Sequence, residues 1–158
     1  MNSEEFAGRI EKIRPALYRI CCMQLANPAD REDAIQEALF KAWKKHSTLR
    51  ETQYFNTWFI RILINECHNV QRRQRRTAPL EKAPEISCHG GFETQNLRLA
   101  LEALDEKQRM CVLLHHIEGY GVRDVAKMLR ISESAVKQRL ARGRKRLKEE
   151  LSEEVFGK

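Results

Sequence analysis

Apolar residues recur at three- and four-residue spacings along almost the whole 158-residue chain, and this period is typical of amphipathic helices. No stretch of useful length alternates apolar and polar residues as a β-strand would. The helical period is lost between Thr77 and Thr94, where TAPLEKAPEISCHGGFET contains two prolines and two glycines. We therefore predict an all-α protein with two small helical domains, residues 1–76 and 95–158, joined by a flexible linker at 77–94.

The N-terminal half contains three predicted helices, which together can form a bundle. The first is marked by Phe6, Ile10, Ile13, Leu17, Ile20 and Leu25. Pro15 lies within this helix and predicts a kink or a fresh start. The second, DREDAIQEALFKAWKK, has its acids early and its lysines late, as the helix dipole prefers. The third, YFNTWFIRILINECHNVQRRQRR, carries an apolar stripe that runs into four arginines.

The C-terminal half ends in a predicted helix-turn-helix. A helical segment, DEKQRMCVLLHHIEG, leads into GVRDVAKMLRIS and ESAVKQRLARGRKRLKEEL, which are joined at residues 129–132. Ser132 is a favourable N-cap for the last helix, and Ala135, Val136 and Leu140 are expected to face inward. In a helix-turn-helix the second helix enters the major groove of DNA.

The charge of the chain agrees with a nucleic-acid partner. Lys and Arg total 29 against 22 Asp and Glu, giving a formal charge of +7, which suits an acidic polymer or a membrane surface. From Lys137 to Lys148, seven of twelve residues are Lys or Arg and none is acidic. A solvated basic face is the alternative interpretation, but its position on the second helix of a helix-turn-helix favours DNA binding.

The predicted helix-turn-helix segment resembles a region of a known protein family. The stretch YGVRDVAKMLRISESAVKQRLARGRKRLKEEL resembles the fourth conserved region of sigma factors in the extracytoplasmic function group, which recognises the −35 promoter element. The resemblance implies that the outward residues near the start of the last helix read bases: Glu133, Ser134, Lys137, Gln138 and Arg139. It implies phosphate contacts for Arg142, Arg144 and Lys145.

The second N-terminal helix resembles part of the second conserved region of the same family. In that family an acidic helix docks on the clamp helices of the polymerase, and DREDAIQEALFKAW is similar to it. The resemblance implies polymerase contacts for Asp33, Gln36 and Glu37. An ordinary solvated helix face is the alternative for these three residues.

The third helix resembles the family's promoter-melting segment, in which an aromatic-rich loop and the following helix capture an unstacked base of the −10 element. Base capture needs a stacking surface, edge hydrogen bonds and cations for the backbone. The implied DNA contacts are Trp58, Arg61, Asn65, Asn69, Arg72 and Arg73. The aromatic residues here are alternatively plain core. The family commonly has Asp four residues after Asn65, whereas this chain has Asn69, which leaves the base preference open.

The resemblance implies that the chain is a sigma factor, with core RNA polymerase (its beta-prime clamp helices and beta flap), promoter DNA and an anti-sigma factor as partners. An ordinary helix-turn-helix repressor is the rival interpretation, and it would bind duplex DNA alone. We expect no catalytic residue, cofactor or metal site, because no catalytic motif is present and the five cysteines have no CxxC spacing. Scattered cysteines also argue against a disulfide framework, and Cys88-His89 alone is weak evidence for metal binding. Without a signal peptide or an apolar run of about 20 residues, we expect a cytoplasmic protein with no membrane insertion.

Overall fold

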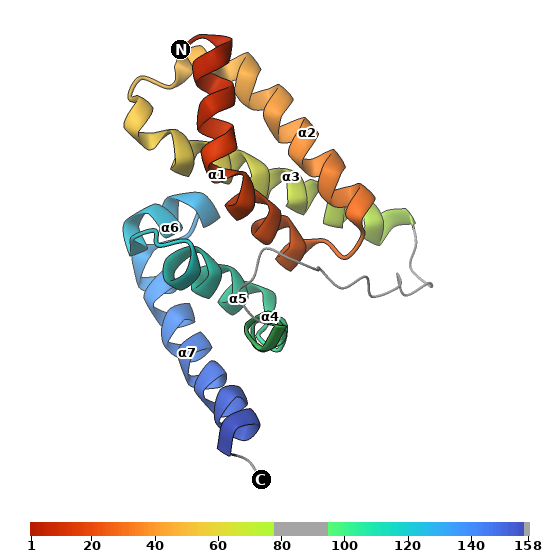
Figure 1. Ribbon diagram of the computed structural model, residues 1–158, viewed down its shortest axis with the longest axis vertical. Helices are drawn as coiled ribbons and strands as arrows, with labels where there is room; N and C mark the ends of the chain where they lie inside the picture. The colour runs from red at the N-terminus through yellow and green to blue at the C-terminus, as the bar shows by residue number, and fades with distance from the viewer. Residues whose placement is uncertain (78–94, 157–158) are drawn as a thin grey trace. The chain divides into compact units, whose positions relative to one another are not determined.

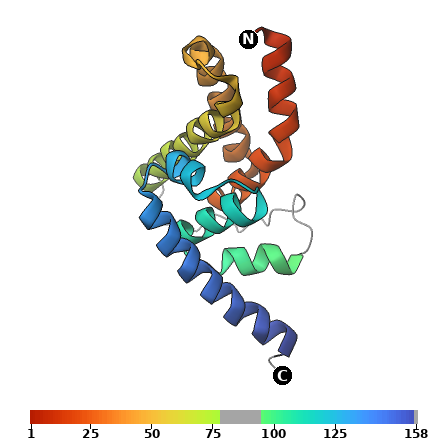
Figure 2. The same cartoon turned by 90° about the vertical axis from the view of Figure 1, so that its left-hand side faces the viewer.

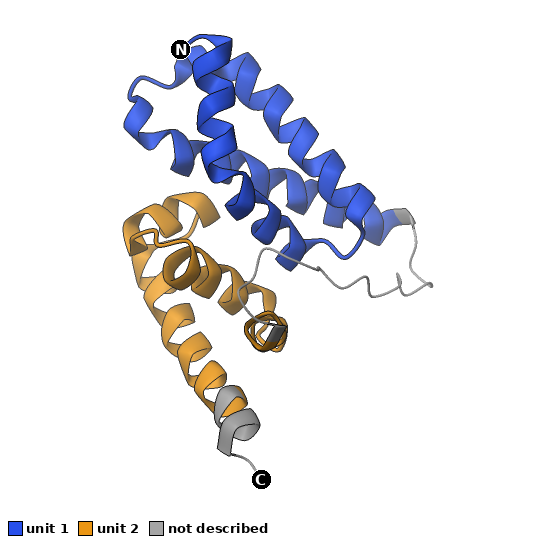
Figure 3. Cartoon of the chain, viewed as in Figure 1, with its two compact units in different colours: residues 1–91 blue, residues 92–158 orange. Residues whose placement is uncertain are grey.

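The computed structural model describes residues 1–77 and 95–156, and their regular structure is helical, as predicted (Figure 1). The chain divides into two compact units, residues 1–91 and 92–158 (Figure 3). Apart from Thr77, the predicted linker 77–94 lies outside the described residues, together with the Cys88-His89 pair. In the described part, no helix has the length and apolar character needed to cross a membrane.

Unit 1 is a bundle of three helices, α1 (Ser3–Gln24), α2 (Pro28–Lys45) and α3 (Phe55–Thr77), which pack against one another in all three pairs (Figure 1). Two short 3-10 turns, His46–Thr48 and Thr52–Tyr54, connect α2 to α3. Asparagine side chains start the first two helices: the Oδ1 atoms of Asn2 and Asn27 accept hydrogen bonds from the amides of Glu5 and Ala29. Pro28 follows at the first helical position, where its missing N–H costs no hydrogen bond.

Helix α1 continues through Pro15 as one helix, so the fresh start that the sequence allowed is not found. A proline inside a helix removes one backbone hydrogen bond and costs about 3 kcal/mol. Pro15 is exposed, whereas the six apolar residues that marked this helix in the sequence are all buried. Burial of this long apolar face against α2 and α3 offsets the local cost.

The side of α2 that faces the core of unit 1 carries small residues. Ala34, Ala38 and Ala42 have no exposed surface, so α2 lies close to its neighbours. The residues that follow these alanines in the sequence are less buried: Ile35 and Leu39 are half-buried, and Trp43 is exposed. The ring of Trp43 stacks on that of His46, with the ring centroids 4.2 Å apart. Arg31 stabilises the turn between α1 and α2, because its guanidinium donates to the carbonyls of Leu25 and Ala26.

Unit 2 contains α4 (Gln95–Glu102), α5 (Glu106–Val112), a π-helical turn η3 (Leu113–Ile117), α6 (Val122–Leu129) and α7 (Glu133–Phe156). Helix α7 packs against α4, α5 and α6 (Figure 2). Asp105 caps α5 by accepting from the amide of Gln108. Arg109 donates to three carbonyls at the end of α4 and in the following turn, those of Leu101, Glu102 and Leu104.

Helices α6 and α7 form the predicted helix-turn-helix. Arg130 closes α6 in the left-handed conformation, with φ 59°, and Ser132 caps α7 by accepting from the amide of Ala135 at 3.0 Å. Val136 and Leu140 are buried as predicted, whereas Ala135 is only half-buried. Gly143 leaves no room for a side chain, because a Cβ there would lie 2.7 Å from Cγ2 of Val112.

The cysteines follow the expectation in part. Cys21, Cys67 and Cys111 are free and buried, as small apolar side chains would be. Cys22 is disulfide-bonded, a single bond that the argument against a disulfide framework did not anticipate.

Candidate functional site

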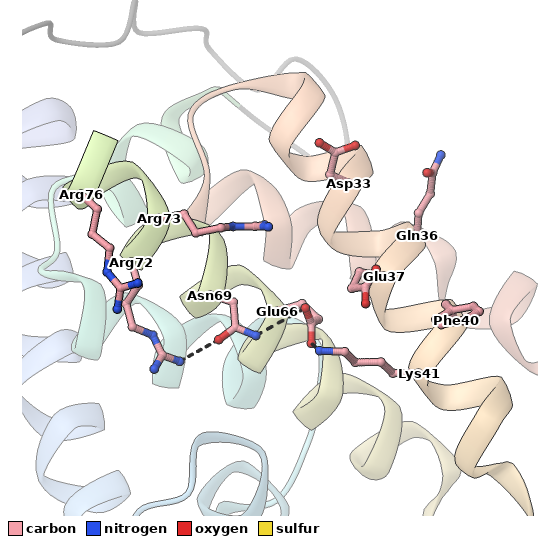
Figure 4. A pocket seen from close by; sticks show the side chains of 10 residues that line it. All are labelled: Asp33, Gln36, Glu37, Phe40, Lys41, Glu66, Asn69, Arg72, Arg73 and Arg76. Carbon is pink, nitrogen blue, oxygen red and sulfur yellow. Dashed lines mark hydrogen bonds and ion pairs between the residues drawn. The ribbon is translucent and has the colours of Figure 1, made fainter. Parts of the chain in front are cut away.

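A groove of about 790 Å³ lies between α2 and α3 in unit 1 (Figure 4). It brings together two groups of residues that the sequence assigned to different partners, polymerase and DNA. The lining residues are Asp33, Gln36, Glu37, Phe40 and Lys41 from α2, and Glu66, Asn69, Arg72, Arg73 and Arg76 from α3. One wall therefore carries acids and the other carries guanidinium groups.

The α2 wall offers unpaired carboxylates. Asp33 and Glu37 are exposed, and the described residues provide neither with a hydrogen bond or an ion pair. Gln36 lies on the same wall and donates weakly to Glu32 at 3.4 Å. Phe40 is 56% exposed, and the Nζ atom of Lys44 lies 4.7 Å from its ring centroid. An exposed aromatic ring is typical of a protein-binding surface.

The α3 wall is linked to α2 by a chain of polar contacts (Figure 4). Lys41 Nζ lies 2.5 Å from Glu66 Oε1, and Glu66 Oε2 accepts from Nδ2 of Asn69 at 3.5 Å. Asn69 Oδ1 in turn accepts from Arg72 at 2.8 Å. The guanidinium of Arg73 extends across the groove toward α2 in Figure 4.

The residues predicted to contact −10 DNA form a line along one face of α3. Steps of three and four residues connect Trp58, Arg61, Asn65, Asn69 and Arg72, and such steps keep side chains on one side of a helix. Arg73 and the exposed Arg76 extend this face at the C-terminal end of α3. Of these residues, Asn69, Arg72 and Arg73 line the groove, whereas Trp58, Arg61 and Asn65 lie outside it. Trp58 is half-buried, with its ring 5.8 Å from that of Phe55, so it combines a core contact with an accessible edge.

Sequence reasoning missed Phe40, Lys41 and Glu66 in this groove. Glu66 lies between Leu63, Cys67 and Val70, which are all buried, and is itself only 4% exposed. An acid at an inward position of an amphipathic helix indicates a buried partner, and this signal was available in the sequence. The identity of the partner could not be read from the sequence, because Lys41 is 25 residues away along the chain.

In unit 2, the predicted −35 residues lie on α7, and they differ in how far they are exposed. Seven of them are exposed: Glu133, Ser134, Lys137, Gln138, Arg142, Arg144 and Lys145. Ser134, Gln138, Arg142 and Lys145 succeed one another at three- and four-residue steps, on the side opposite the buried Val136 and Leu140. This side of α7 combines uncharged hydrogen-bonding groups with cations, which suits base edges and phosphates.

Arg139 and Arg144 lie at the two margins of that surface and contact α5 and η3. Arg139 is half-buried and lies close enough to the Cys111 thiol to affect its pKa. Burial raises the pKa of Cys111, and the nearby Arg139 guanidinium acts in the opposite direction. Arg144 lies 3.5 Å from Nε2 of His116, whose pKa is lowered by partial burial and by the charges of His115 and Arg144. His115 bonds to the carbonyl of Tyr120 through Nδ1 at 2.7 Å.

The described side chains include no group of three or more His, Cys, Asp or Glu residues arranged to hold a metal ion. The adjacent histidines of η3 contact a backbone carbonyl and an arginine. The two surfaces in α2–α3 and α7 are therefore the candidate sites.

Known families match both halves of the chain. Residues 9–77 match Sigma-70 region 2, and residues 94–147 match Sigma-70, region 4. The ECF RNA polymerase sigma factor SigM of Mycobacterium tuberculosis is 33% identical over 135 residues, covering 83% of this chain and 69% of that protein. The RNA polymerase sigma-E factor of Streptomyces coelicolor is 29% identical over 152 residues, covering 93% of this chain and 86% of that protein.

Solved structures resemble the fold of this chain. The sigma factor RpoE of Bartonella quintana, in complex with the anti-sigma factor NepR, has a TM-score of 0.77 and 25% identity, covering 94% of this chain and 98% of that one. CnrH, in complex with the cytosolic domain of CnrY, has a TM-score of 0.68 at 21% identity and covers 96% of this chain and 90% of that one.

Proposed function

Because this chain belongs to the sigma-70 family of RNA polymerase sigma factors, within the extracytoplasmic function subfamily, we propose a division of its work between two surfaces. The chain binds core RNA polymerase and directs promoter-specific transcription initiation. In the proposal, residues 1–76 dock on polymerase and melt the −10 element, residues 77–94 connect, and residues 95–158 hold the −35 element.

The observation that carries the proposal is the two-walled groove of unit 1. Free carboxylates at Asp33 and Glu37 face outward beside the exposed ring of Phe40, and we assign this α2 wall and Gln36 to the clamp helices of polymerase. The opposite wall carries guanidinium groups that would repel a basic partner and attract DNA. One groove thus separates the two partners by charge.

The face of α3 is assigned to the non-template strand. Trp58 supplies an aromatic surface, and the amide of Asn65 has no hydrogen bond within the described residues, so it is free to meet a base edge. Arg61, Arg72 and Arg73 supply cations along the same face. The line from Trp58 to Arg76 is roughly 27 Å long at 1.5 Å per residue, enough to follow several nucleotides.

The exposed side of α7 is assigned to the −35 element as duplex DNA. Glu133, Ser134, Lys137 and Gln138 are placed at base edges, and Arg142, Arg144 and Lys145 at phosphates. We give Arg139 a supporting role, because it is half-buried and its charge acts on Cys111 of α5. The rest of unit 2 is the proposed partner of the polymerase flap.

Three further aspects follow from membership of the family. We propose that the chain catalyses no reaction itself and needs no cofactor. We propose that it acts in the cytoplasm, where RNA polymerase is found. RpoE of Bartonella quintana was solved in complex with the anti-sigma factor NepR, and we propose that an anti-sigma factor also binds this chain.

Transcription reconstituted from core RNA polymerase, this protein and fragmented genomic DNA tests the proposal. Protein-dependent start sites should share two elements at a fixed spacing. The double variant Asp33→Ala/Glu37→Ala should lose most of its affinity for core polymerase, whereas Glu4→Gln, an exposed acid of α1, should not. Binding of duplex DNA without any initiation would instead support a helix-turn-helix repressor.

A further inference from the structure

We infer that Glu66 is a positioning residue for promoter reading, acting with Lys41 to hold Asn69 and Arg72 in one fixed arrangement. The inference rests on the proposed role of α3 in contacting DNA. Glu66 is directed away from solvent, so it acts through Asn69 instead of touching DNA itself.

Glu66 is unusual because it is a carboxylate with only 5% of its side chain exposed. Burying a charge is costly unless a partner and hydrogen bonds compensate it. Lys41 provides the counter-charge from α2 at 2.5 Å, and its own side chain remains 39% exposed. The free carboxylate oxygen of Glu66 is then directed along α3 toward Asn69.

The charges on either side fix the orientation of the Asn69 amide. An ionised carboxylate only accepts hydrogen bonds and a guanidinium only donates them. Nδ2 of Asn69 must therefore face Glu66, at 3.5 Å, and Oδ1 must face Arg72, at 2.8 Å. The amide cannot flip without losing both contacts.

This arrangement also prepares Arg72. Its guanidinium has five N–H groups; one donates to Asn69 and one weakly to the carbonyl of His68 at 3.5 Å. The remaining N–H groups have no bond within the described residues, and the side chain is exposed. Because Asn69 is neutral, the positive charge of Arg72 is not cancelled. A cation held in place before DNA arrives loses less conformational freedom on binding.

A purely structural ion pair is the simpler alternative. Lys41 and Glu66 would then stabilise the packing of α2 on α3, and removing the pair would lower stability without altering which bases are preferred. The two possibilities differ in one measurable property, the base preference at the promoter positions that Asn69 and Arg72 contact.

The experiment uses the full chain with core RNA polymerase and a promoter library randomised across the −10 element. The variants are Glu66→Gln, Asn69→Asp and the double variant. Glu66→Gln should lower transcription about fivefold, since one hydrogen bond is worth about a factor of this size, and should broaden the base preference. Asn69→Asp puts a second carboxylate beside Glu66 and cancels the charge of Arg72, so its penalty should be smaller in the Glu66→Gln background.

Three controls make the test decisive. Glu5→Gln breaks the Arg9–Glu5 pair elsewhere in unit 1 and should leave base preference unchanged. The double variant Lys41→Met/Glu66→Gln removes both charges together and leaves no unpaired buried charge, so it replaces Glu66→Gln as the probe if that variant unfolds. Asn69→Ala and Arg72→Ala test the underlying site.

The outcomes separate the inference from the proposed function. Broadened preference and non-additive penalties support the positioning role. Additive penalties with an unchanged preference would overturn that role while Asn69→Ala and Arg72→Ala still impair transcription. If neither alanine variant impairs transcription, the proposed DNA contacts of α3 are wrong, and the inference that rests on them is wrong too.

Discussion

Replacing Gly143 by alanine tests how closely α7 packs on α5. The added methyl group would lie 2.7 Å from Cγ2 of Val112, whereas ordinary contact begins at 3.4 Å. Val112 is 2% exposed, and its branched side chain has few rotamers with which to move away. Either the valine or the helix crossing has to shift.

Two opposing terms determine the size of the effect. Overpacking in a well-packed core costs typically 1–3 kcal/mol, and alanine gains about 1 kcal/mol over glycine in a helix. We expect the clash to exceed the gain, with a net loss of about 1 kcal/mol. In a domain of this size, that loss lowers the unfolding midpoint by about 4–8 °C.

Gly8 provides a matched control for the same substitution. It lies in α1, and nothing is within 4 Å of the position a Cβ would occupy. Gly8→Ala should therefore raise the stability of unit 1 by up to about 1 kcal/mol, through helix propensity alone. The two alanines should shift stability in opposite directions.

Two spectroscopic signals can separate the units. Both tryptophans, Trp43 and Trp58, belong to unit 1, so their fluorescence follows the unfolding of that unit. Circular dichroism follows the helices of both units. Gly143→Ala should shift the dichroism transition of unit 2 and leave the fluorescence transition in place. An unchanged or higher midpoint for Gly143→Ala would refute the clash at Val112.

Three further predictions concern unit 2. Ser132→Ala should cost about 1 kcal/mol by removing the cap of α7, and Ser132→Asn should restore it; equal stability of the alanine variant in denaturant titrations would contradict this. Arg142→Ala should weaken holoenzyme binding to −35 duplexes of all sequences and reduce the salt slope by about 1, whereas a sequence-dependent loss would indicate base reading instead. The pKa of His116 is lowered in the folded state, so as the pH falls the unfolded state binds the proton first. The contribution of His116 to folding stability is therefore full above about pH 6.5 and declines as the pH falls through the folded pKa. Unfolding midpoints at about pH 7.5 and 5.5 should differ more for the native chain than for His116→Gln.

The helices and their inward faces could be predicted from the sequence because both depend on local spacing. The predicted segments at residues 30–45 and 54–76 differ from α2 and α3 by at most two residues at either end. The turn of the helix-turn-helix was also predictable, since Ser132 is a strong capping residue. These features need no knowledge of how distant segments meet.

The contacts between helices could not be predicted in the same way. The pairing of Glu66 with Lys41 depends on how α2 and α3 settle against each other, and no local pattern encodes that register. The family resemblance implied that Arg139 reads bases, yet it is half-buried close to Cys111. The π-helical turn at η3 likewise has no recognised sequence signature.

The two arginines that close interhelical turns have a consequence for how the chain tolerates change. Arg31 bonds two carbonyls after α1, and Arg109 bonds three at and after the end of α4. A lysine at either position would keep the formal charge of +7, but a single ammonium group cannot span carbonyls that a planar fork reaches together. Exchanging every arginine for lysine, a common way to preserve charge in engineered basic proteins, should therefore fail first at these turns. Total charge and the charge available to DNA are separate properties of this chain.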